Sequence, residues 1–266
     1  MNHRPSIRHA VILAAGKGTR MGAITHRMPK PMLPINGKPM LEHILERLAL
    51  SGVERFFIVV GYHHEIIEQH FRDWPVPIEF RRQDPVNGTG AAARLAKDFV
   101  AIEPFLLTYA DILCDPTEYT RCSTVLREHS EAGAVLAVKA VADPRQGAAV
   151  YEQNGRIHRI VEKPRQGTSS TQWNSAGFYA FRPVLFEYLD LIQPSARHEY
   201  ELTSALGLML ASGLELRISP IVGDWRDVGR PEDLAAMNDG SLSSRSTPDP
   251  DPHANLRNLP RPPKAG

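Results

Sequence analysis

The chain has 266 residues, of which 42% are hydrophobic, and its formal net charge is +1 at pH 7. This length and apolar content suffice for one large α/β domain, and the near-zero charge gives no reason to expect a nucleic acid or a membrane surface as a partner. With only two cysteines, Cys114 and Cys122, the chain needs no disulfide framework, and we expect a reducing compartment. No apolar stretch is long enough for a membrane span, and residues 1–9 lack the apolar core of a signal peptide. We therefore expect a cytoplasmic protein.

The first half of the chain alternates predicted strands and helices. Strands are predicted where short apolar runs rich in β-branched residues occur, and helices where apolar residues recur at helical spacing. The strands are expected at residues 10–13, 55–60, 78–81 and 105–109, and the helices at 41–50, 65–71, 91–99 and 116–126. Asp115 caps the last helix, with Pro116 at its first position. This alternation predicts an α/β fold with a mostly parallel, Rossmann-like doubly wound sheet flanked by helices, which binds ligands beyond the carboxyl ends of its strands.

The second half continues the same sheet with a different mix of elements. Strands are expected at residues 134–139, 148–152, 157–162 and 175–181, and helices at 184–189, 202–210 and 232–238. The Asn154-Gly155 pair predicts a hairpin between the second and third of these strands. From residue 240 onward Ser, Asp, Pro and Arg dominate without apolar periodicity, so we expect residues 240–266 to form a disordered tail.

The strand at residues 10–13 opens into a glycine-rich loop, LAAGKGTRM at residues 13–21. Its small residues let backbone N–H groups approach a polyphosphate, and Arg20 and Lys30 add fixed positive charge. Two common phosphate-binding motifs do not match. A Walker loop requires Ser or Thr where Gly18 stands, and a dinucleotide fingerprint requires a small residue where Met21 stands. The loop is therefore a basic glycine loop of a third kind.

This loop, followed by PKPMLPI at residues 29–35 and GKPML at residues 37–41, resembles the sugar-1-phosphate nucleotidylyltransferases, also called nucleotide-sugar pyrophosphorylases. The resemblance implies a nucleotidyltransferase domain at residues 9–239, with a nucleotide-binding part at about 9–130 and a sugar-phosphate-binding part at 131–239. It implies transfer of a nucleotidyl group from a nucleoside triphosphate to a sugar-1-phosphate, with release of pyrophosphate.

The resemblance further implies that the loop and a second segment bind the nucleotide. The loop residues are Leu13, Ala14, Ala15, Gly16, Gly18 and Thr19. In the second segment, RQDPVNGTG at residues 82–90, Gln83 resembles the residue that reads the base, since an amide offers a donor and an acceptor to the imide edge of uracil or thymine. Gly88 lets the backbone approach the base, and Thr89 begins the helix beneath it. The Gly88-Thr89 pair is more similar to uridylyltransferases than to thymidylyltransferases, which favours UTP over dTTP.

The VEKP motif at residues 161–164 resembles the family's contact to the sugar phosphate. The resemblance implies that Lys163 neutralises the attacking phosphate and that Glu162 accepts hydrogen bonds from sugar hydroxyls. Pro164 is expected to hold Lys163 in an extended backbone conformation. Gly147 matches a glycine that allows the sugar to approach closely.

Another sugar contact stays open between two neighbouring residues. The family carries Asn or another small polar residue two positions before the glycine of a Gly-x-Tyr strand. Here Ser175 has that position, and Asn174 stands one residue earlier. The EYELT segment at residues 199–203 also resembles a family segment near the sugar pocket, without an assigned role.

Two aspartates that follow apolar runs, Asp111 and Asp227, match the residues that hold Mg²⁺ in the family. Mg²⁺ prefers hard oxygen ligands and usually takes one or two carboxylates together with phosphates and water. For Asp111 taken alone, a helix cap or a loop carboxylate is the plainer interpretation. Asp224 matches no ligand of the family, and we expect it to be exposed to solvent.

The implied reaction joins two anions, so charge repulsion is its main barrier. Arg20, Lys30, Lys163 and Mg²⁺ are expected to offset that repulsion, without a covalent intermediate. Two other classes of function stay open: a non-catalytic relative that binds nucleotide-sugars and regulates a partner, and a nicotinamide-dependent oxidoreductase, against which Met21 counts. The sequence is also compatible with a homo-oligomer.

Overall fold

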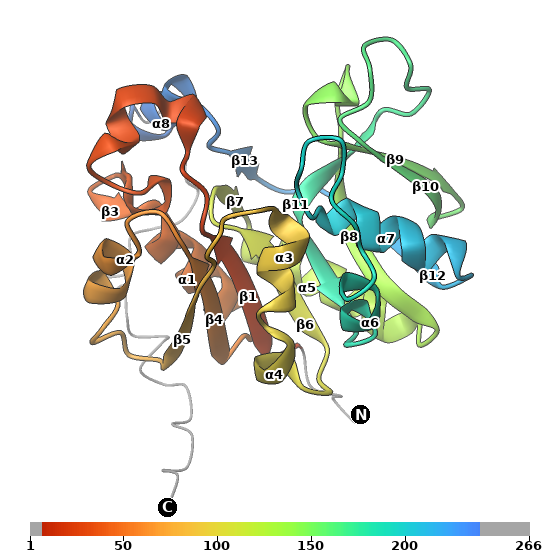
Figure 1. Ribbon diagram of the computed structural model, residues 1–266, viewed down its shortest axis with the longest axis horizontal. Coiled ribbons are helices and arrows are strands. Elements are labelled where there is room, and N and C mark those ends of the chain that lie inside the picture. Colours follow the sequence, from red (N-terminus) through yellow and green to blue (C-terminus); the bar gives the residue numbers. More distant parts are fainter. Residues whose placement is uncertain (1–6, 240–266) are drawn as a thin grey trace, which may run out of the picture.

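The computed structural model describes residues 7–239, so the tail predicted at residues 240–266 lies outside the described residues (Figure 1). Within the described range, one large sheet has the strand order β5 (Ile78–Arg82), β4 (Arg55–Val60), β1 (His9–Ala14), β6 (Phe105–Tyr109), β11 (Trp173–Phe181), β8 (Ala132–Ala140), β12 (Glu215–Pro220), β10 (Arg156–Glu162), β9 (Ala148–Gln153). Two small sheets pair β7 (Ile112–Cys114) with β13 (Trp225–Asp227) and β2 (Pro34–Ile35) with β3 (Lys38–Pro39). Among the described residues, no helix has both the length and the apolar character to cross a membrane.

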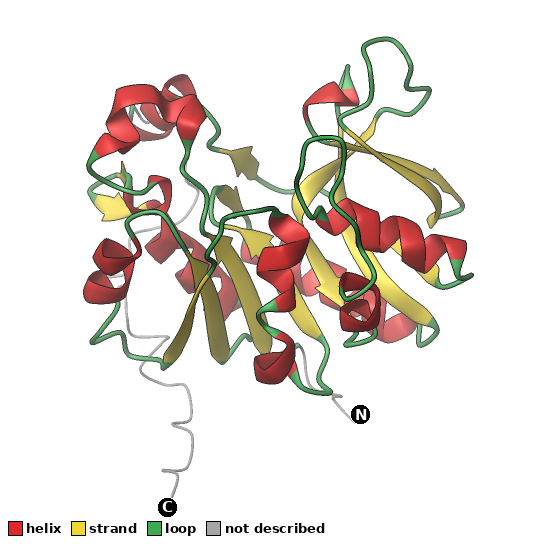
Figure 2. Cartoon of the chain, in the orientation of Figure 1, coloured by secondary structure: helices red, strands yellow, loops and turns green. Residues whose placement is uncertain are grey.

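Helices cover both faces of the large sheet (Figure 2). One face carries α1 (Met40–Leu50), α2 (His64–His70) and α5 (Pro116–Glu128), and the other carries α3 (Thr89–Arg94), α4 (Lys97–Val100), α6 (Leu185–Leu189) and α7 (Leu202–Ala211). Alternate residues of β1 enter the two cores: Ile12 packs in the core with α1 and α5, and Val11 packs in the core with α3 and α7. This burial on both faces confirms the doubly wound α/β fold.

The first four strands of the sheet are parallel, as the sequence predicts. β1 pairs in parallel with both β4 and β6, and β4 pairs in parallel with β5. The single helix predicted at residues 91–99 is wrong, because α3 and α4 are separate helices. The N–H groups of Leu95 and Ala96 bond to carbonyls three residues back, which tightens the chain there and ends α3.

The remaining strands make the sheet mixed, so the mostly parallel order holds only for its first part. β11 lies antiparallel to β6 and to β8, and β12 is parallel to β8. The predicted hairpin is confirmed: β9 and β10 pair antiparallel across Asn154 and Gly155, whose φ angles are 54° and 78°. A two-residue turn of this kind requires positive φ at both positions and reverses the chain, which a parallel sheet cannot accommodate.

The sequence analysis missed the strands β2, β3, β7, β12 and β13. β7 and β13 form a two-stranded antiparallel ribbon in which Ile112 pairs with Asp227. After β13, α8 (Pro231–Asn238) packs back toward β2, where the Asn238 side chain accepts a hydrogen bond from Asn36 N–H at 2.7 Å. Three-residue strands are too short to show a periodicity of two, so the sequence pattern did not reveal the ribbon. Short 3₁₀ helices η1 (Thr19–His26), η2 (Lys30–Met32) and η3 (Pro144–Gln146) complete the described elements.

A glycine in β11 tests the packing of the sheet against the ribbon. Gly177 has a φ of 81°, and a Cβ there would lie 2.8 Å from Ile112 Cγ1. Gly177→Ala should lower the free energy of unfolding by about 2–4 kcal/mol, because the backbone conformation is unfavourable for alanine and the added methyl overlaps β7. Gly207→Ala is the matched control: Gly207 lies inside α7 with no atom within 4 Å of its Cβ position, so this change should stabilise by about 0.5–1 kcal/mol. Urea unfolding measures both, and a Gly177→Ala protein as stable as its parent would contradict the packing.

Candidate active site

A cleft of about 1010 Å³ lies at the carboxyl ends of the parallel strands. Every residue to which the sequence analysis gave a binding or catalytic role lines it. These are Leu13, Ala14, Ala15, Gly16, Gly18, Thr19, Arg20, Lys30, Gln83, Gly88, Thr89, Asp111, Gly147, Glu162, Lys163, Asn174, Ser175 and Asp227. The fold therefore brings the two halves of the predicted site together in one place.

The glycine loop forms one wall of the cleft, and its two glycines have different surroundings. Gly18 has a φ of 63°, and a Cβ there would lie 2.9 Å from Lys30 Cβ, so a glycine is needed for Lys30 to pack beneath the loop. Gly16 is exposed, and no atom lies within 4 Å of its Cβ position. The loop is thus closed toward Lys30 and open at Gly16, where a ligand can approach the backbone.

The ribbon of β7 and β13 brings the two predicted metal ligands together. Val228 N–H donates to the carbonyl oxygen of Asp111 at 3.0 Å, which fixes Asp227 beside Asp111. Lys30, which is 7% exposed, donates from Nζ to Asp111 Oδ2 at 2.6 Å. A Cβ at Gly229 would lie 3.3 Å from Asp227 Oδ1 and 3.4 Å from Arg20 Nη1, so Arg20 approaches the same carboxylates.

Asp227 lies beside a second carboxylate, that of Asp111, and this proximity affects its pKa. Reduced hydration against the cleft wall, together with repulsion from Asp111, raises the pKa of Asp227 to about 6, while Lys30 and Arg20 act in the opposite direction. Asp227 is nevertheless exposed toward the cleft, so solvent screens part of this repulsion. Asp224 is exposed and lies outside the lining of the cleft, as expected.

Gln83 is buried, and its amide has less freedom than the sequence analysis expected. Its Nε2 donates to Asn87 Oδ1 at 3.2 Å and to the carbonyl oxygen of Gly88 at 2.9 Å. Both N–H bonds are used inside the protein, so Gln83 offers a ligand only the acceptor Oε1. The donor that the sequence analysis expected Gln83 to offer a base is thus already bonded within the protein in this structure.

Position 88 requires a glycine because the backbone of Tyr200 packs against it. The φ of Gly88 is 124°, and a Cβ there would lie 2.3 Å from the carbonyl oxygen of Tyr200. The next residue continues this contact, because Leu202 N–H donates to Thr89 Oγ1 at 3.0 Å. The segment at residues 199–203, which had no assigned role, thus packs directly against the loop predicted to read the base.

The backbone of Lys163 is not extended, so the expectation drawn from Pro164 is wrong. Lys163 has a φ of 41°, and its N–H donates to the carbonyl oxygen of Gly147 at 2.9 Å. This hydrogen bond turns the chain at the end of β10 and overrides the preference set by the following proline. A positive φ is costly for a residue with a side chain and is common at functional sites.

The side chains of Asn174 and Ser175 differ in which of their polar atoms already have hydrogen-bond partners. Asn174 Nδ2 donates to the carbonyl oxygen of Pro144 at 3.1 Å, whereas its buried Oδ1 has no hydrogen-bond partner. The hydroxyl of Ser175 is hydrogen-bonded to the Tyr179 hydroxyl at 2.8 Å, which lies 3.4 Å from the Tyr109 hydroxyl. Burial raises the pKa values of both tyrosines, so these phenols stay protonated.

The sequence analysis missed several charged residues that line the cleft. Arg197 pairs with Glu162 at 3.4 Å and with Glu201 at 3.0 Å, so the predicted sugar contact Glu162 already has a cationic partner. Lys139 also lines the cleft. A lysine at the end of an otherwise apolar predicted strand was the one sequence signal for it, whereas nothing in the local pattern marked Arg197.

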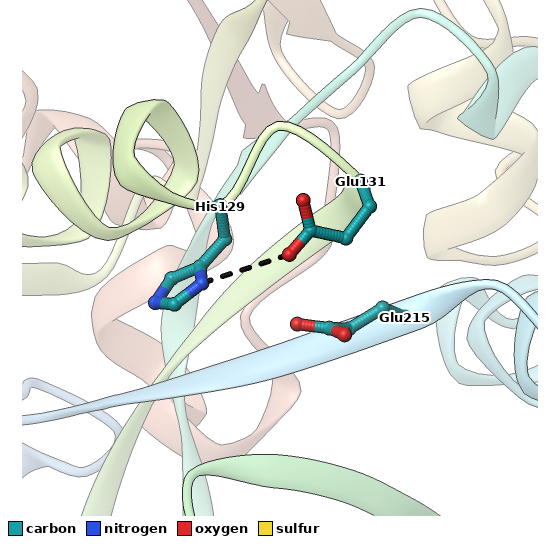
Figure 3. Close-up of side chains that lie close together, drawn as sticks. All are labelled: His129, Glu131 and Glu215. Carbon is teal, nitrogen blue, oxygen red and sulfur yellow. Dashed lines mark ion pairs between the residues drawn. The ribbon is translucent and has the colours of Figure 1, made fainter.

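A second group of potential metal ligands lies outside the cleft. His129, Glu131 and Glu215 place ligand atoms within 4.8 Å of one another (Figure 3). Glu215 is already paired with Arg156 at 2.8 Å and with Arg217 at 2.7 Å. The neighbouring arginines neutralise Glu215 and disfavour a cation there, so we assign no metal site to this group.

Comparison with known proteins identifies the same family as the sequence motifs. A family model described as nucleotidyl transferase matches residues 9–244. The UTP–glucose-1-phosphate uridylyltransferase AglF of Haloferax volcanii is 37% identical over 232 residues, which cover 84% of this chain and 92% of AglF. The bifunctional protein GlmU of Methanocaldococcus jannaschii is 35% identical over 243 residues, which cover 90% of this chain and 55% of GlmU. The chain thus spans about half the length of that relative.

Solved structures share the fold. A putative glucose-1-phosphate thymidylyltransferase from Bacillus anthracis has a TM-score of 0.78 at 25% identity, covering 92% of this chain and 98% of that one. A UDP-glucose pyrophosphorylase complexed with UDP-glucose has a TM-score of 0.80 at 24% identity, covering 90% of this chain and all of the other. The oxidoreductase alternative is therefore wrong. The chain belongs to the sugar-1-phosphate nucleotidyltransferases, enzymes that transfer a nucleotidyl group onto a sugar-1-phosphate.

Proposed function

We propose that this enzyme transfers a uridylyl group from UTP to a hexose-1-phosphate such as glucose-1-phosphate, with dTTP as the next-best nucleotide. The observation that carries the proposal is the convergence of the glycine loop, Gln83, Asp111, Asp227 and Lys163 on one cleft. The name of the relative AglF, a UTP–glucose-1-phosphate uridylyltransferase, supports UTP and glucose-1-phosphate as the substrates.

The nucleotide is proposed to bind in the part of the cleft formed by residues 9–130. Gln83 Oε1 accepts a hydrogen bond from the imide N–H of uracil or thymine, and both pyrimidines carry that donor. The backbone from Gly16 to Thr19 faces the phosphates, since the Cβ position of Gly16 is open. Arg20, which belongs to this loop, and Lys30, which packs against Gly18, offset the charge of the triphosphate.

The two aspartates fit a magnesium site. Asp111 and Asp227 supply hard oxygen donors side by side, and reduced hydration together with repulsion from Asp111 raises the pKa of Asp227, an effect that a bound divalent cation would offset. We propose that these carboxylates hold Mg²⁺, which when bound neutralises phosphate charge at the point of transfer. Lys30 holds Asp111 in place through its 2.6 Å ion pair.

The sugar phosphate is proposed to bind in the part formed by residues 131–239. Glu162 accepts hydrogen bonds from sugar hydroxyls, Gly147 lets the ring approach, and Asn174 or Ser175, which both line the cleft, supplies a further sugar contact. Lys163 neutralises the phosphate, whose oxygen attacks the α-phosphorus in line while pyrophosphate leaves.

No protein nucleophile takes part in this proposal. A phosphate dianion is itself nucleophilic, so the residues of the site align the two substrates and reduce their repulsion. Burial raises the pKa of Cys114 to about 12 and also raises that of Cys122, so neither thiol forms a thiolate near neutral pH. The transfer is direct.

A substrate matrix tests the proposal. Pyrophosphate release is measured with Mg²⁺, UTP, dTTP, CTP, ATP or GTP, and several sugar-1-phosphates. UTP with a hexose-1-phosphate should give the highest rate and dTTP the second. A preference for ATP or GTP would contradict the proposed pyrimidine nucleotide, and no pyrophosphate with any pair would identify a non-catalytic relative.

Asp227→Asn should change stability and activity in opposite directions: the metal-free protein becomes more stable, and the enzyme becomes less active. The folded pKa of about 6 lies above the ordinary value of 3.8, so ionised Asp227 destabilises the metal-free protein fully above pH 6 and not at all below pH 4. Because solvent screens this residue, we expect the variant to be more stable by only about 1 kcal/mol at pH 8, with the gain shrinking toward pH 5. Its activity with Mg²⁺ should fall on the order of 100-fold.

Urea unfolding in EDTA at both pH values measures the stability change. Asp224→Asn is the control, since an exposed carboxylate outside the cleft should alter stability by less than about 0.5 kcal/mol. A loss of stability in Asp227→Asn at pH 8 would show that the carboxylate pair is favourable without a metal.

A further inference from the structure

Lys139 is a cation of the cleft to which neither the family motifs nor the proposed mechanism gives a role. It lies near the end of β8 and lines the cleft. Lys30 is paired with Asp111, and Arg197 is paired with Glu162 and Glu201. Among residues 7–239, by contrast, no carboxylate lies within ion-pair distance of the Lys139 ammonium. Its charge is therefore available to an anionic ligand.

An aromatic ring holds the Lys139 ammonium in place. Lys139 Nζ lies 5.0 Å from the centroid of the Trp225 ring, a distance at which a cation is attracted to the π face. The Trp225 indole N–H donates to the carbonyl oxygen of Ala176 at 2.8 Å, which fixes the ring. The lysine is thus oriented without being neutralised, because an aromatic face carries no net charge.

The position of Lys139 connects the sugar side of the cleft with the carboxylate pair. On one side, the register of β8 and β11 sets Lys139 opposite Asn174, which packs against Gly147. On the other side, Trp225 begins the strand that ends at Asp227. In the proposed function the sugar binds at the first place and the α-phosphorus lies near the second, so the attacking phosphate bridges the two.

We propose that Lys139 binds the phosphate of the sugar-1-phosphate, as a second cation beside Lys163. The inference rests on the proposed function and adds a substrate-binding residue to it. A phosphate dianion carries two charges, so one lysine leaves it incompletely neutralised before it meets the anionic triphosphate. Lys139 can donate to it without breaking an ion pair of the protein.

Kinetics of Lys139→Met, with Lys139→Arg and Lys97→Met for comparison, test the assignment. Lys139→Met should lower kcat/KM for the sugar-1-phosphate about 10- to 100-fold, the usual range for a lost charge-assisted contact. The dissociation constant of UTP, measured by calorimetry without the sugar phosphate, should change less than about twofold. Lys139→Arg should restore most of the activity, because it keeps the charge.

Lys97→Met controls for the loss of one positive charge. Lys97 is exposed, pairs with Asp190 and lies outside the lining of the cleft, so its removal should leave both constants unchanged. Thermal unfolding of all variants shows whether they fold. Rising salt should weaken the parent's kcat/KM more steeply than that of Lys139→Met.

The outcomes separate this inference from the proposed function. A parent protein that releases no pyrophosphate contradicts the function itself. An active parent whose Lys139→Met variant keeps its kcat/KM for the sugar phosphate contradicts only the assignment of Lys139. Weaker UTP binding in that variant would place Lys139 on the triphosphate and would also overturn the assignment.

Discussion

The pairing of two three-residue strands, β7 and β13, is the constraint on which the site depends. β7 follows the last parallel strand of the first half, and β13 lies near the end of the described chain, so their pairing joins the two halves of the fold. It sets Asp111 and Asp227 side by side and also carries Trp225, over which Lys139 lies. Like charges this close are tolerated because Lys30 and Arg20 lie beside them.

Much of the fold could be predicted from the sequence because its signals are local and strong. Strands such as β4, with five consecutive buried residues, and amphipathic helices such as α1 show their periodicity directly. The cap at Asp115 is confirmed by its hydrogen bond from Thr117 N–H at 2.9 Å. The residues of the candidate site could also be predicted from the sequence, because a composite motif identifies many positions at once. The fold gathers all of them in one cleft.

The rest depends on contacts that are distant in the sequence. The mixed direction of the sheet arises from where β11 is inserted, and no local pattern encodes a strand's neighbours. The hydrogen bond to Gly147 sets the backbone of Lys163, and two internal acceptors use the amide of Gln83. The roles of Arg197 and Lys139 depend on the residues that they contact in the folded protein: Glu162 and Glu201 for Arg197, and Trp225 for Lys139. Tertiary contacts override local preference at these positions, and they are concentrated at the site.

The close approach of Gly88 to Tyr200 joins two lining segments of the cleft that are distant in the sequence. The loop that holds Gln83 cannot shift without moving the segment at residues 199–203, since backbone meets backbone there with no space for a side chain between them. That segment carries Glu201, whose ion pair leads through Arg197 to Glu162 on the opposite wall. Backbone contact and ion pairs thus form one continuous connection between the loop that holds Gln83 and Glu162, across segments that are far apart in the sequence.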